Sequence, residues 1–236
     1  MRGAEREGRA HCLNEPWRPA PSLATVTPMA EKKRCMWASG LDDPEYVRYH
    51  DEEWGRPSHD DRHLFEMITL EGAQAGLSWS TILHKRANYR KAFASFDPKK
   101  VARFDAKRQA ALMNDAGIVR NRLKIDSTVT NAQTFLQVQK EFGSFDHYLW
   151  AFVDGKPVVD IRPRGERLPA STDLSDQISK DLKKRGFRFV GTTIIYAFLQ
   201  AVGVVNDHGR DCFLAPKARK ASTTVVPRKK RAMEPA

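Results

Sequence analysis

The chain has 236 residues, of which 41% are hydrophobic and 29% are charged, and its formal net charge is +11. This length suits one globular domain with room for a small lobe, and the sequence has no run of about 18 apolar residues that would predict a membrane-spanning helix. Three cysteines are an odd number, which argues against a disulfide framework and favours a reducing compartment.

The positive charge is concentrated at the C-terminal end. Residues 214–236 hold seven Lys or Arg side chains and one Glu, so they carry +6 of the net charge. A basic chain favours a polyanionic partner, with nucleic acid as the first candidate, although a tail that only keeps a protein soluble has the same composition. We predict a disordered extension at 1–30, a folded domain at 31–214 and a disordered basic tail at 215–236.

Between these ends the sequence has the periodicity of helices joined by short connectors. Asp43-Pro44 is a capping residue followed by proline, which predicts a helix to about residue 54. A helix from residue 79 is expected to continue until Asp97-Pro98 ends it. Helical patterns also cover about 106–115, 121–140, 145–153, 174–185 and 192–203, whereas 154–170 indicates an irregular loop or a short strand. The sequence therefore predicts an all-α domain.

Two pairs of cysteine and histidine stand near the ends of the predicted domain. His208 and Cys212 have the i, i+4 spacing that places two ligands on one helical turn, and Cys35 with His50 would complete a Cys₂His₂ set. This composition is usual for a structural zinc site. The spacing alone favours the alternative of two small buried thiols and two hydrogen-bonded histidines.

A carboxylate ends the apolar stripe of the helix that begins at Asp60-Asp61. Glu71 follows Leu64 and Ile68 on one helical face, so it is expected to point toward the core. Burying an ionised carboxylate is unfavourable unless a partner compensates it. Glu71 is therefore either paired with a nearby arginine, for which Arg86 is available, or waiting for a cationic or proton-donating ligand.

Aromatic residues are grouped near Glu71 in the sequence. Tyr46, Tyr49 and Trp54 recur along one helix, and Trp79 follows Glu71 across a short connector. Rings around a buried carboxylate suit a flat, electron-poor guest that is held by stacking and cation–π attraction. Ordinary core packing would produce the same stripe.

Residues 182–194 predict a helix, a turn bounded by Gly186 and Gly191, and a second helix. The free N–H groups at the start of the second helix can meet a phosphate, and basic side chains flank the turn. This pattern is typical of a helix-hairpin-helix that binds the DNA backbone without reading sequence, and a plain helical hairpin with a solvated basic edge remains the alternative. The residues expected to contact DNA here are Lys183, Lys184, Gly186, Arg188, Gly191 and Thr192.

Six segments together resemble the 3-methyladenine DNA glycosylase I family. They are RCMW at 34–37, DPEYVRYHDEEWG at 43–55, LFEMITLEGAQAGLSW at 64–79, KRANYRKAF at 85–93, DAGIVRNRLKI at 115–125 and LKKRGFRFVGTTIIYAFLQAVGVVNDH at 182–208. The resemblance covers about residues 34–212 in one consistent order. It is weakest over 154–170 and does not extend to either tail.

The resemblance implies an all-α helix-hairpin-helix glycosylase fold, with one structural Zn²⁺ per chain joining the N- and C-terminal parts. It assigns the metal to Cys35, His50, His208 and Cys212. It also implies that Glu71 contacts the damaged base, and that Gly76 and Leu77 fill the gap left by a flipped nucleotide. The base-binding residues it implies are Tyr49 and Trp79 as walls, with Tyr46 and Trp54 close by.

These observations predict a DNA repair enzyme that excises 3-methyladenine from damaged double-stranded DNA by hydrolysing the N-glycosidic bond. We expect it to be monofunctional, because no lysine falls in the inferred pocket, and to act as a monomer in the cytoplasm, associated with the nucleoid. Asp207 lies downstream of the hairpin and ranks below Glu71 as a catalytic candidate, since its neighbour His208 is claimed by zinc.

Three other functions are weighed against this one. A DNA-binding module without activity would gain nothing from a buried Glu71. A metallohydrolase would need an open coordination position, which four protein ligands do not leave. An acyl hydrolase built on Ser78, Ser80 and His84 lacks the strand-turn-helix elbow that such a nucleophile needs.

Overall fold

The computed structural model describes residues 32–160 and 167–216. The predicted extension at 1–30, with Cys12, and nearly all of the predicted tail at 215–236 lie outside the described residues, as does part of the predicted loop at 154–170. The proposed domain boundaries therefore stay a prediction.

The first helices begin at capping residues that the sequence supplies. A one-turn 3-10 helix η1 (Met36–Ala38) precedes α1 (Pro44–Glu52), α2 (Asp61–Gln74) and α3 (Trp79–Ala92). The side chains of Asp43, Asp60 and Ser78 each accept a hydrogen bond from a backbone N–H in the first turn of the helix that follows. These contacts satisfy N–H groups that have no partner inside the helix.

The third helix ends earlier than its sequence pattern predicts. It stops at Ala92, and the next turn, η2 (Ala94–Phe96), has positive φ at all three residues, at 51°, 54° and 55°. Both Phe93 and Phe96 are buried, and their rings stack with centroids 6.3 Å apart.

The remaining helical predictions are confirmed to within a few residues. The chain continues through α4 (Pro98–Val101), α5 (Ala106–Leu112), α6 (Arg122–Phe142), α7 (Phe145–Trp150), η3 (Ala151–Val153), α8 (Asp173–Arg185) and α9 (Thr192–Ala201). The protein is therefore predominantly helical. Among the described residues, none of the helices is both long and apolar enough to cross a bilayer.

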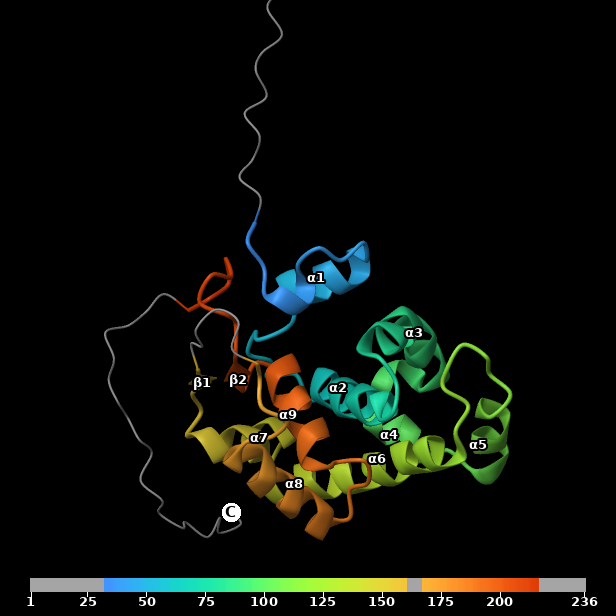
Figure 1. Ribbon diagram of the computed structural model, residues 1–236. Coiled ribbons are helices and arrows are strands. Elements are labelled where there is room, and N and C mark those ends of the chain that lie inside the picture. Colours follow the sequence, from blue (N-terminus) through green and yellow to red (C-terminus); the bar gives the residue numbers. More distant parts are fainter. Residues whose placement is uncertain (1–31, 161–166, 217–236) are drawn as a thin grey trace, which may run out of the picture. The chain divides into compact units, whose positions relative to one another are not determined.

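A short parallel pair of strands is the one addition to the helices among the described residues. β1 (Val158–Val159) pairs with β2 (Val205–Asn206), in the register Val158 with Val205. The pair places the chain near residue 158 beside the segment that follows α9 (Figure 1). It agrees with the short strand allowed for 154–170 and leaves the domain predominantly helical, as the predicted all-α class implies.

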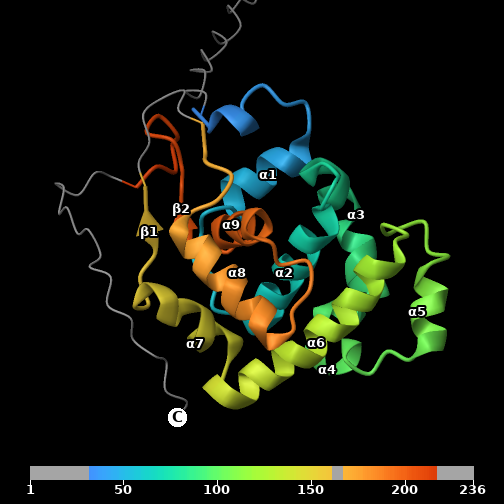
Figure 2. The ribbon, with the colours of Figure 1, turned by 60° about the horizontal axis from the view of Figure 1, so that its bottom comes forward.

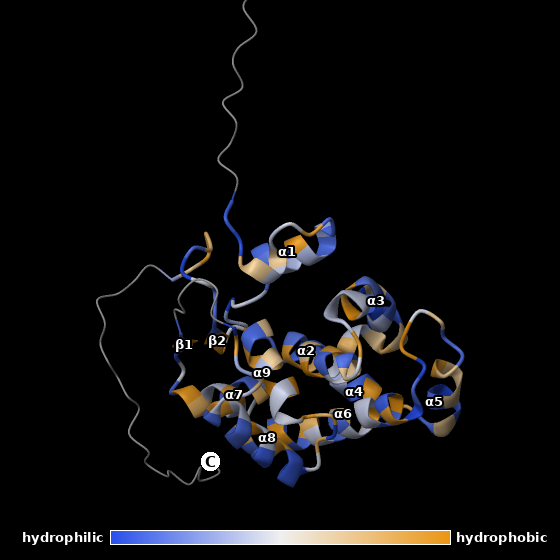
Figure 3. Cartoon of the chain, in the orientation of Figure 1, coloured by the Kyte–Doolittle hydropathy of each residue, from blue (hydrophilic) through white to orange (hydrophobic). Residues whose placement is uncertain are grey.

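Helix α2 is the central element around which the described helices pack. It contacts α3, α6, α7 and α9, and Figure 2 shows it enclosed by these neighbours. Ten of its fourteen residues are buried. Figure 3 shows apolar residues on the inward sides of α2 and α9 and polar residues on the outer side of α8. Glu71 therefore lies on the most enclosed helix of the domain.

Candidate functional site

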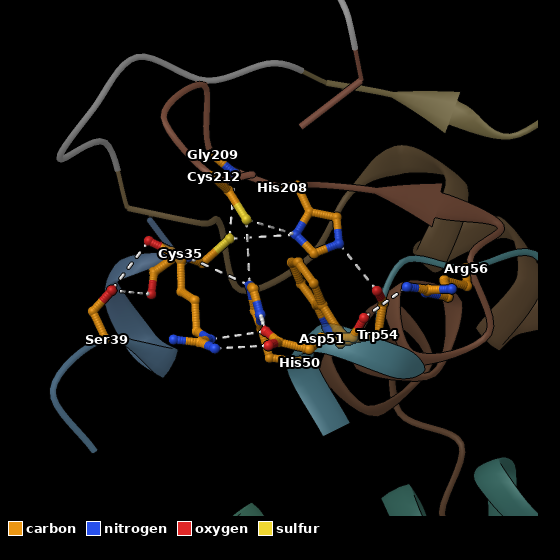
Figure 4. Close-up of polar contacts among 10 residues, drawn as sticks. Cys35, Ser39, His50, Asp51, Trp54, Arg56, His208, Gly209 and Cys212 are labelled. Carbon is orange, nitrogen blue, oxygen red and sulfur yellow. Dashed lines mark hydrogen bonds and ion pairs between the residues drawn. The ribbon is translucent and has the colours of Figure 1, made fainter. Parts of the chain in front are cut away.

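Cysteine and histidine side chains from the two ends of the domain meet in one buried cluster. Cys35 precedes η1, His50 lies in the last turn of α1, and His208 and Cys212 follow β2. Their ligand atoms all lie within 4.8 Å of one another, and all four residues are buried. Figure 4 shows the four side chains converging, with the two sulfur atoms facing the two imidazole rings. We call these four residues the Cys/His cluster.

The distances in the Cys/His cluster agree with tetrahedral metal coordination. The Sγ atom of Cys35 lies 3.5 Å from Nδ1 of His208, and the Sγ atom of Cys212 lies 3.5 Å from Nδ1 of His208 and from Nε2 of His50. Zinc bonds of about 2.3 Å to sulfur and about 2.0 Å to nitrogen place such atoms roughly 3.5 Å apart at tetrahedral angles. Both cysteines are free thiols. The cluster could thus hold a metal ion.

Each histidine is oriented by a hydrogen bond at the nitrogen that faces away from the cluster. Nδ1 of His50 lies 2.8 Å from Oδ1 of Asp51, and Arg34 donates two hydrogen bonds to the same carboxylate. Nε2 of His208 donates to the carbonyl oxygen of Trp54 at 3.0 Å. These contacts leave Nε2 of His50 and Nδ1 of His208 for a metal.

The environment favours one thiolate in the pair of cysteines. The hydrogen bond from Cys35, and then those from His208 and His50, hold the pKa of the Cys212 thiol well below its ordinary value. The hydrogen bond with Cys212 and burial raise the pKa of the Cys35 thiol, although the backbone N–H of Gly209 donates to its sulfur at 3.4 Å. A thiolate is the form that binds zinc, so a metal at this cluster would displace the proton of Cys35.

Glu71 is buried, and the structure gives its carboxylate no hydrogen bond or ion pair with another described residue. Its side chain is on the enclosed face of α2, and the residue is 4% exposed. Burial raises the pKa of Glu71 to about 8. This environment is the expected one for a carboxylate that lacks a partner until a ligand arrives.

The arginine considered as a partner for Glu71 is engaged elsewhere, which corrects that alternative. Arg86 donates to Glu66 at 2.6 Å and forms two hydrogen bonds with Glu53 at 2.7 and 2.9 Å. Arg90 adds two further bonds to Glu66. Arg86 thus joins the end of α1 and the middle of α2 to α3, and leaves Glu71 uncompensated.

Three of the predicted aromatic residues lie near Glu71. The rings of Tyr49 and Trp79 are 5.2 Å apart, and both residues are buried. Burial raises the pKa of the Tyr46 and Tyr49 hydroxyls, and the Glu71 carboxylate raises both further. The indole N–H of Trp79 is buried and has no hydrogen-bond partner among the described residues. The site thus holds a carboxylate and an N–H donor that both lack partners in the described part of the chain.

Trp54 was predicted to be a base-binding residue, and the structure places it against the Cys/His cluster. Its ring packs against His50 and His208 of the Cys/His cluster, at centroid distances of 6.4 and 4.7 Å. Trp37, which the sequence analysis did not single out, is 5.0 Å from Trp54 and 5.5 Å from Tyr46. Trp37 therefore links the Cys/His cluster to the rings near Glu71. Its position in the RCMW segment, two residues after Cys35, was the signal in the sequence.

The connector between α2 and α3 exposes an apolar side chain close to this site. Gly76 has a φ of +77°, which favours glycine, and Leu77 is 42% exposed. Ser78 then caps α3 and Trp79 begins it. The predicted wedge residues thus stand between the helix that carries Glu71 and the helix that carries Trp79.

The predicted hairpin is a turn between α8 and α9. Gly186 ends α8 in the left-handed conformation, with a φ of +104°, and Gly191 is the capping residue of α9. Asn131 of α6 fixes the turn through two hydrogen bonds with the backbone of Arg188. The side chains of Lys183, Lys184 and Arg188 are exposed, whereas the Thr192 hydroxyl is hydrogen-bonded to Ser175 and Asp176 of α8.

The hairpin is packed closely on α2. A Cβ atom at Gly72 would lie 3.2 Å from Cβ of Phe189, so the small residue permits this approach. Phe189 itself has a φ of +54°. Because Gly72 directly follows Glu71, the turn between α8 and α9 contacts the same part of α2 that carries Glu71.

The hydrogen bonds of Asp207 go to α9 and not to the residues around Glu71. The residue is 4% exposed, and its Oδ2 accepts hydrogen bonds from Tyr196 and, at 2.7 Å, from Gln200 of α9. These contacts tie the segment before His208 to α9. They agree with the lower rank given to Asp207.

Taken together, these features define a predominantly helical protein with a Cys/His cluster suited to a metal, a buried unpaired carboxylate among aromatic rings, and a basic hairpin beside it. The family model of methyladenine glycosylases matches residues 37–215. The chain therefore belongs to the methyladenine glycosylase family.

Curated relatives and solved structures agree with this assignment. The chain is 50% identical to DNA-3-methyladenine glycosylase 1 of Escherichia coli (strain K12), over 78% of this chain and 97% of that protein. It is 46% identical to DNA-3-methyladenine glycosylase of Haemophilus influenzae, over 76% of this chain and 96% of that protein.

Among solved structures, a crystal structure of 3-methyladenine DNA glycosylase I matches with a TM-score of 0.75 and 48% identity, over 78% of this chain and all of that one. A variant of 3-methyladenine DNA glycosylase I in complex with 3-methyladenine matches with a TM-score of 0.74 and 40% identity, over 77% of this chain and 98% of that one.

Proposed function

We propose that this protein is a DNA repair glycosylase that removes 3-methyladenine from alkylated double-stranded DNA and leaves an abasic site. The observation that carries this proposal is the buried, unpaired carboxylate of Glu71 beside the rings of Tyr49 and Trp79. The relatives named for the same reaction support it. We further propose that it acts as a monomer on DNA in the cytoplasm.

The substrate supplies much of the driving force for the reaction. A 3-methylated adenine nucleoside carries a delocalised positive charge, so the base leaves with the electron pair of the N-glycosidic bond as a neutral molecule. The sugar is left as an oxocarbenium-like cation. Water then adds to C1′ and loses a proton to solvent, which completes the hydrolysis. The protein has to select the cationic base and stabilise the transition state.

Glu71 is proposed to make that selection. With a pKa of about 8 the carboxyl is mostly protonated at neutral pH in the free protein. A cationic base between Tyr49 and Trp79 favours the ionised form, so we expect binding to release a proton. An ordinary adenine brings no positive charge and leaves the buried carboxylate uncompensated, which disfavours it.

DNA is proposed to be held at two places beside this site. Leu77 replaces the base that has been taken out of the stack, and apolar side chains suit this role. The turn bounded by Gly186 and Gly191 holds phosphate through free N–H groups at the start of α9, as in a helix-hairpin-helix, with Lys183, Lys184 and Arg188 nearby.

The Cys/His cluster is proposed to bind one structural Zn²⁺. Cys35, His50, His208 and Cys212 would fill all four positions, so the metal would supply rigidity and no coordination site for water. It would join the two ends of the domain on the side of Trp54 and Trp37. The reaction itself would depend on Glu71 and the aromatic rings.

The reaction is proposed to stop at the abasic site. A strand-cleaving lyase needs an amine that forms a Schiff base with the opened sugar. Lys124, which contacts the chain just before Gly76 and Leu77, has its ammonium hydrogen-bonded to two backbone carbonyls. Sodium borohydride should therefore trap no covalent adduct with abasic DNA, and a trapped adduct would contradict the monofunctional reaction.

Base release from methylated duplex DNA tests the function as a whole. Wild-type protein and Glu71→Gln are incubated with the same DNA, and the released bases are separated by chromatography. We expect wild type to release 3-methyladenine and Glu71→Gln to release at least 10-fold less, because the amide cannot compensate the cationic base. Glu45→Gln, an exposed carboxylate of α1, is the matched control and should match wild type.

Two results would contradict the proposal in different ways. Undiminished release by Glu71→Gln would remove the role of this carboxylate while leaving the activity. No released base from folded, metal-loaded wild type would favour a DNA-binding module without glycosylase activity, which binding to duplex DNA would then identify.

A further inference from the structure

A lysine from α6 holds the loop that carries Leu77. The ammonium of Lys124, in the first turn of α6, donates to the carbonyl oxygens of Ala73 at 2.8 Å and Ala75 at 2.7 Å. These carbonyls lie at the C-terminal end of α2, where the last turn has acceptors without partners inside the helix. The last turn of α2 contains no basic residue of its own. Lys124 therefore supplies from α6 the cation that α2 lacks.

The same two hydrogen bonds fix one end of the wedge loop. Gly76 and Leu77 directly follow Ala75, and a Cβ atom at Gly76 would touch nothing within 4 Å. Packing therefore does not restrain the loop at Gly76, and Leu77 is exposed. At its other end, the loop is held by the hydrogen bond between the Ser78 side chain and the backbone N–H of Thr81. Within the loop, the backbone N–H of Leu77 donates to the carbonyl oxygen of Gln74 at 2.6 Å. The geometry of Leu77 is thus set by this bond and by the hydrogen bonds at the two ends.

The hydrogen bonds of Lys124 go to the backbone and not to Glu71. Its ammonium donates to the carbonyl oxygens of Ala73 and Ala75, and it forms no ion pair with Glu71 in the described part of the chain. Lys124 acts on backbone carbonyls that follow Glu71 by two and four residues, at the point where α2 turns into the loop.

We propose that Lys124 is a positioning residue for base excision, which holds the loop at 75–78 so that Leu77 is presented to the gap in the duplex. This inference rests on the proposed function. It predicts that Lys124 matters for duplex DNA, where a base has to be taken out of the stack and replaced. It predicts no role in binding the free base, because the hydrogen bonds of Lys124 go to the backbone of Ala73 and Ala75 and not to Glu71, Tyr49 or Trp79.

The test compares Lys124→Met, which keeps the chain length and removes the donors, with Lys124→Arg, which restores charge and donors. Lys85→Met is the matched control, because Lys85 also donates to a backbone carbonyl, that of Ala116, at 2.9 Å. Four quantities are measured for each variant: single-turnover excision from methylated duplex and from methylated single-stranded DNA, the Kd for free 3-methyladenine, and the salt dependence of duplex binding.

We expect Lys124→Met to slow duplex excision by about 10- to 100-fold, since a misplacement of about 1 Å near a reacting group has effects of this size. Excision from single strands and the Kd for free 3-methyladenine should stay within about threefold of Lys85→Met. Lys124→Arg should recover most of the duplex rate. Failure of wild type on both DNA substrates would count against the proposed function, whereas wild-type activity makes the comparison of variants decisive for Lys124.

Three results would overturn the role of Lys124. Equal duplex rates for Lys124→Met and Lys85→Met would show that the loop needs no such support. Equal losses on duplex, single strand and free base would indicate general damage to the fold. A salt dependence weaker than that of Lys85→Met by about one counterion would show that Lys124 binds a phosphate directly.

Discussion

Glu71 shows how one buried residue can set both recognition and pH dependence. Its ordinary pKa of 4.5 is raised to about 8 because burial disfavours the charged form. Between these two pH values the unfolded chain has lost the proton that the folded protein retains. The unfolded state then binds fewer protons, so the free energy of unfolding falls as pH rises over this range, by about 1.4 kcal/mol per pH unit at most.

Removal of this ionisable group should stabilise the free protein in a pH-dependent way. Glu71→Gln stays neutral at all pH values, so its Tm should exceed that of wild type by an amount that grows from about pH 5 to about pH 8 and then stays constant. Thermal unfolding across this range measures the difference. Glu45→Gln should give no such trend, and a Tm difference for Glu71→Gln that is independent of pH would contradict the raised pKa.

Asp51 acts at the residue scale on the Cys/His cluster. It accepts from Nδ1 of His50, and Arg34 hydrogen bonds, followed by the contact with His50, lower the pKa of Asp51 to about 2 against the effect of burial. The carboxylate therefore stays ionised at neutral pH. It fixes the orientation of the His50 ring and leaves Nε2 for the metal.

Loss of the hydrogen bond between Asp51 and His50 should weaken metal binding by the Cys/His cluster. Asp51→Asn keeps the shape and removes the charge, so we expect an affinity for Zn²⁺ about 10-fold lower or more, within the range found for such supporting residues. Competition with a chromophoric chelator measures it. Glu52→Gln, an exposed neighbour on the same helix, is the control, and equal affinities for the two variants would exclude the supporting role.

At the scale of elements, Arg86 joins the three helices that carry the site. It is on α3 with Trp79, it pairs with Glu66 on α2, and it pairs with Glu53 directly after α1. The side chains of Arg86 and Glu66 are 7% and 8% exposed, so this part of the network is screened little by solvent. Tyr49, Glu71 and Trp79 lie on these three helices, so the guanidinium of Arg86 helps to hold them in place relative to one another.

Breaking this network from the buried side should destabilise the protein strongly. Arg86→Met leaves the Glu66 and Glu53 carboxylates without their buried partner, and we expect a loss of about 3 to 5 kcal/mol in the free energy of unfolding. Arg90→Met removes a partner of Glu66 that is 49% exposed and should cost about 1 kcal/mol or less. Urea unfolding of both variants tests this, and similar losses would contradict the distinction.

Most of the helices could be predicted because their start signals are local. Asp43 forms the cap expected of it, with Pro44 in the first turn, and the apolar stripe of α2 faces the core. The end of α3 could not be predicted, because positive φ at Ala94 and its two successors has no glycine to signal it and depends on the stacking of Phe93 with Phe96. Local pattern determines where a helix begins, whereas distant packing determines where this one ends.

The candidate site also has features that the sequence predicts and contacts that it does not. Burial of Glu71 follows from helical phase, which the sequence contains. The pairing of Arg86 with Glu53 does not follow from the sequence pattern, because Glu53 reaches Arg86 only after α1 has packed on α3. The place of Trp54 beside His208 likewise depends on the return of the chain after α9, more than 150 residues later. Contacts between distant segments are what the spacing of residues leaves open.

At the scale of the whole described domain, residues 55–58 and residues 200–203 are far apart in sequence but are joined by backbone hydrogen bonds and close packing. The backbone N–H of Gly55 donates to Gln200 at 2.8 Å, and that of Ser58 donates to Val202 at 3.0 Å. Gly203 approaches Arg56 so closely that an added Cβ would lie 2.1 Å from its carbonyl carbon. The Cys/His cluster lies at one end of this contact, so a metal would strengthen an association that hydrogen bonds and packing already make.

Removal of the metal should therefore loosen one end of the domain without unfolding it. A metal that links Cys35 to His208 closes a loop of 173 residues, which restricts the unfolded chain and raises stability. We expect a chelator to lower Tm by several degrees and to speed hydrogen exchange at 35–50 and 208–212, while helix content and exchange in α2 stay unchanged. Cys212→Ser should reproduce these effects in the absence of chelator. Complete unfolding would show that the contacts at Gly55 and Gly203 depend on the metal, and an unchanged Tm would show that no structural metal is bound.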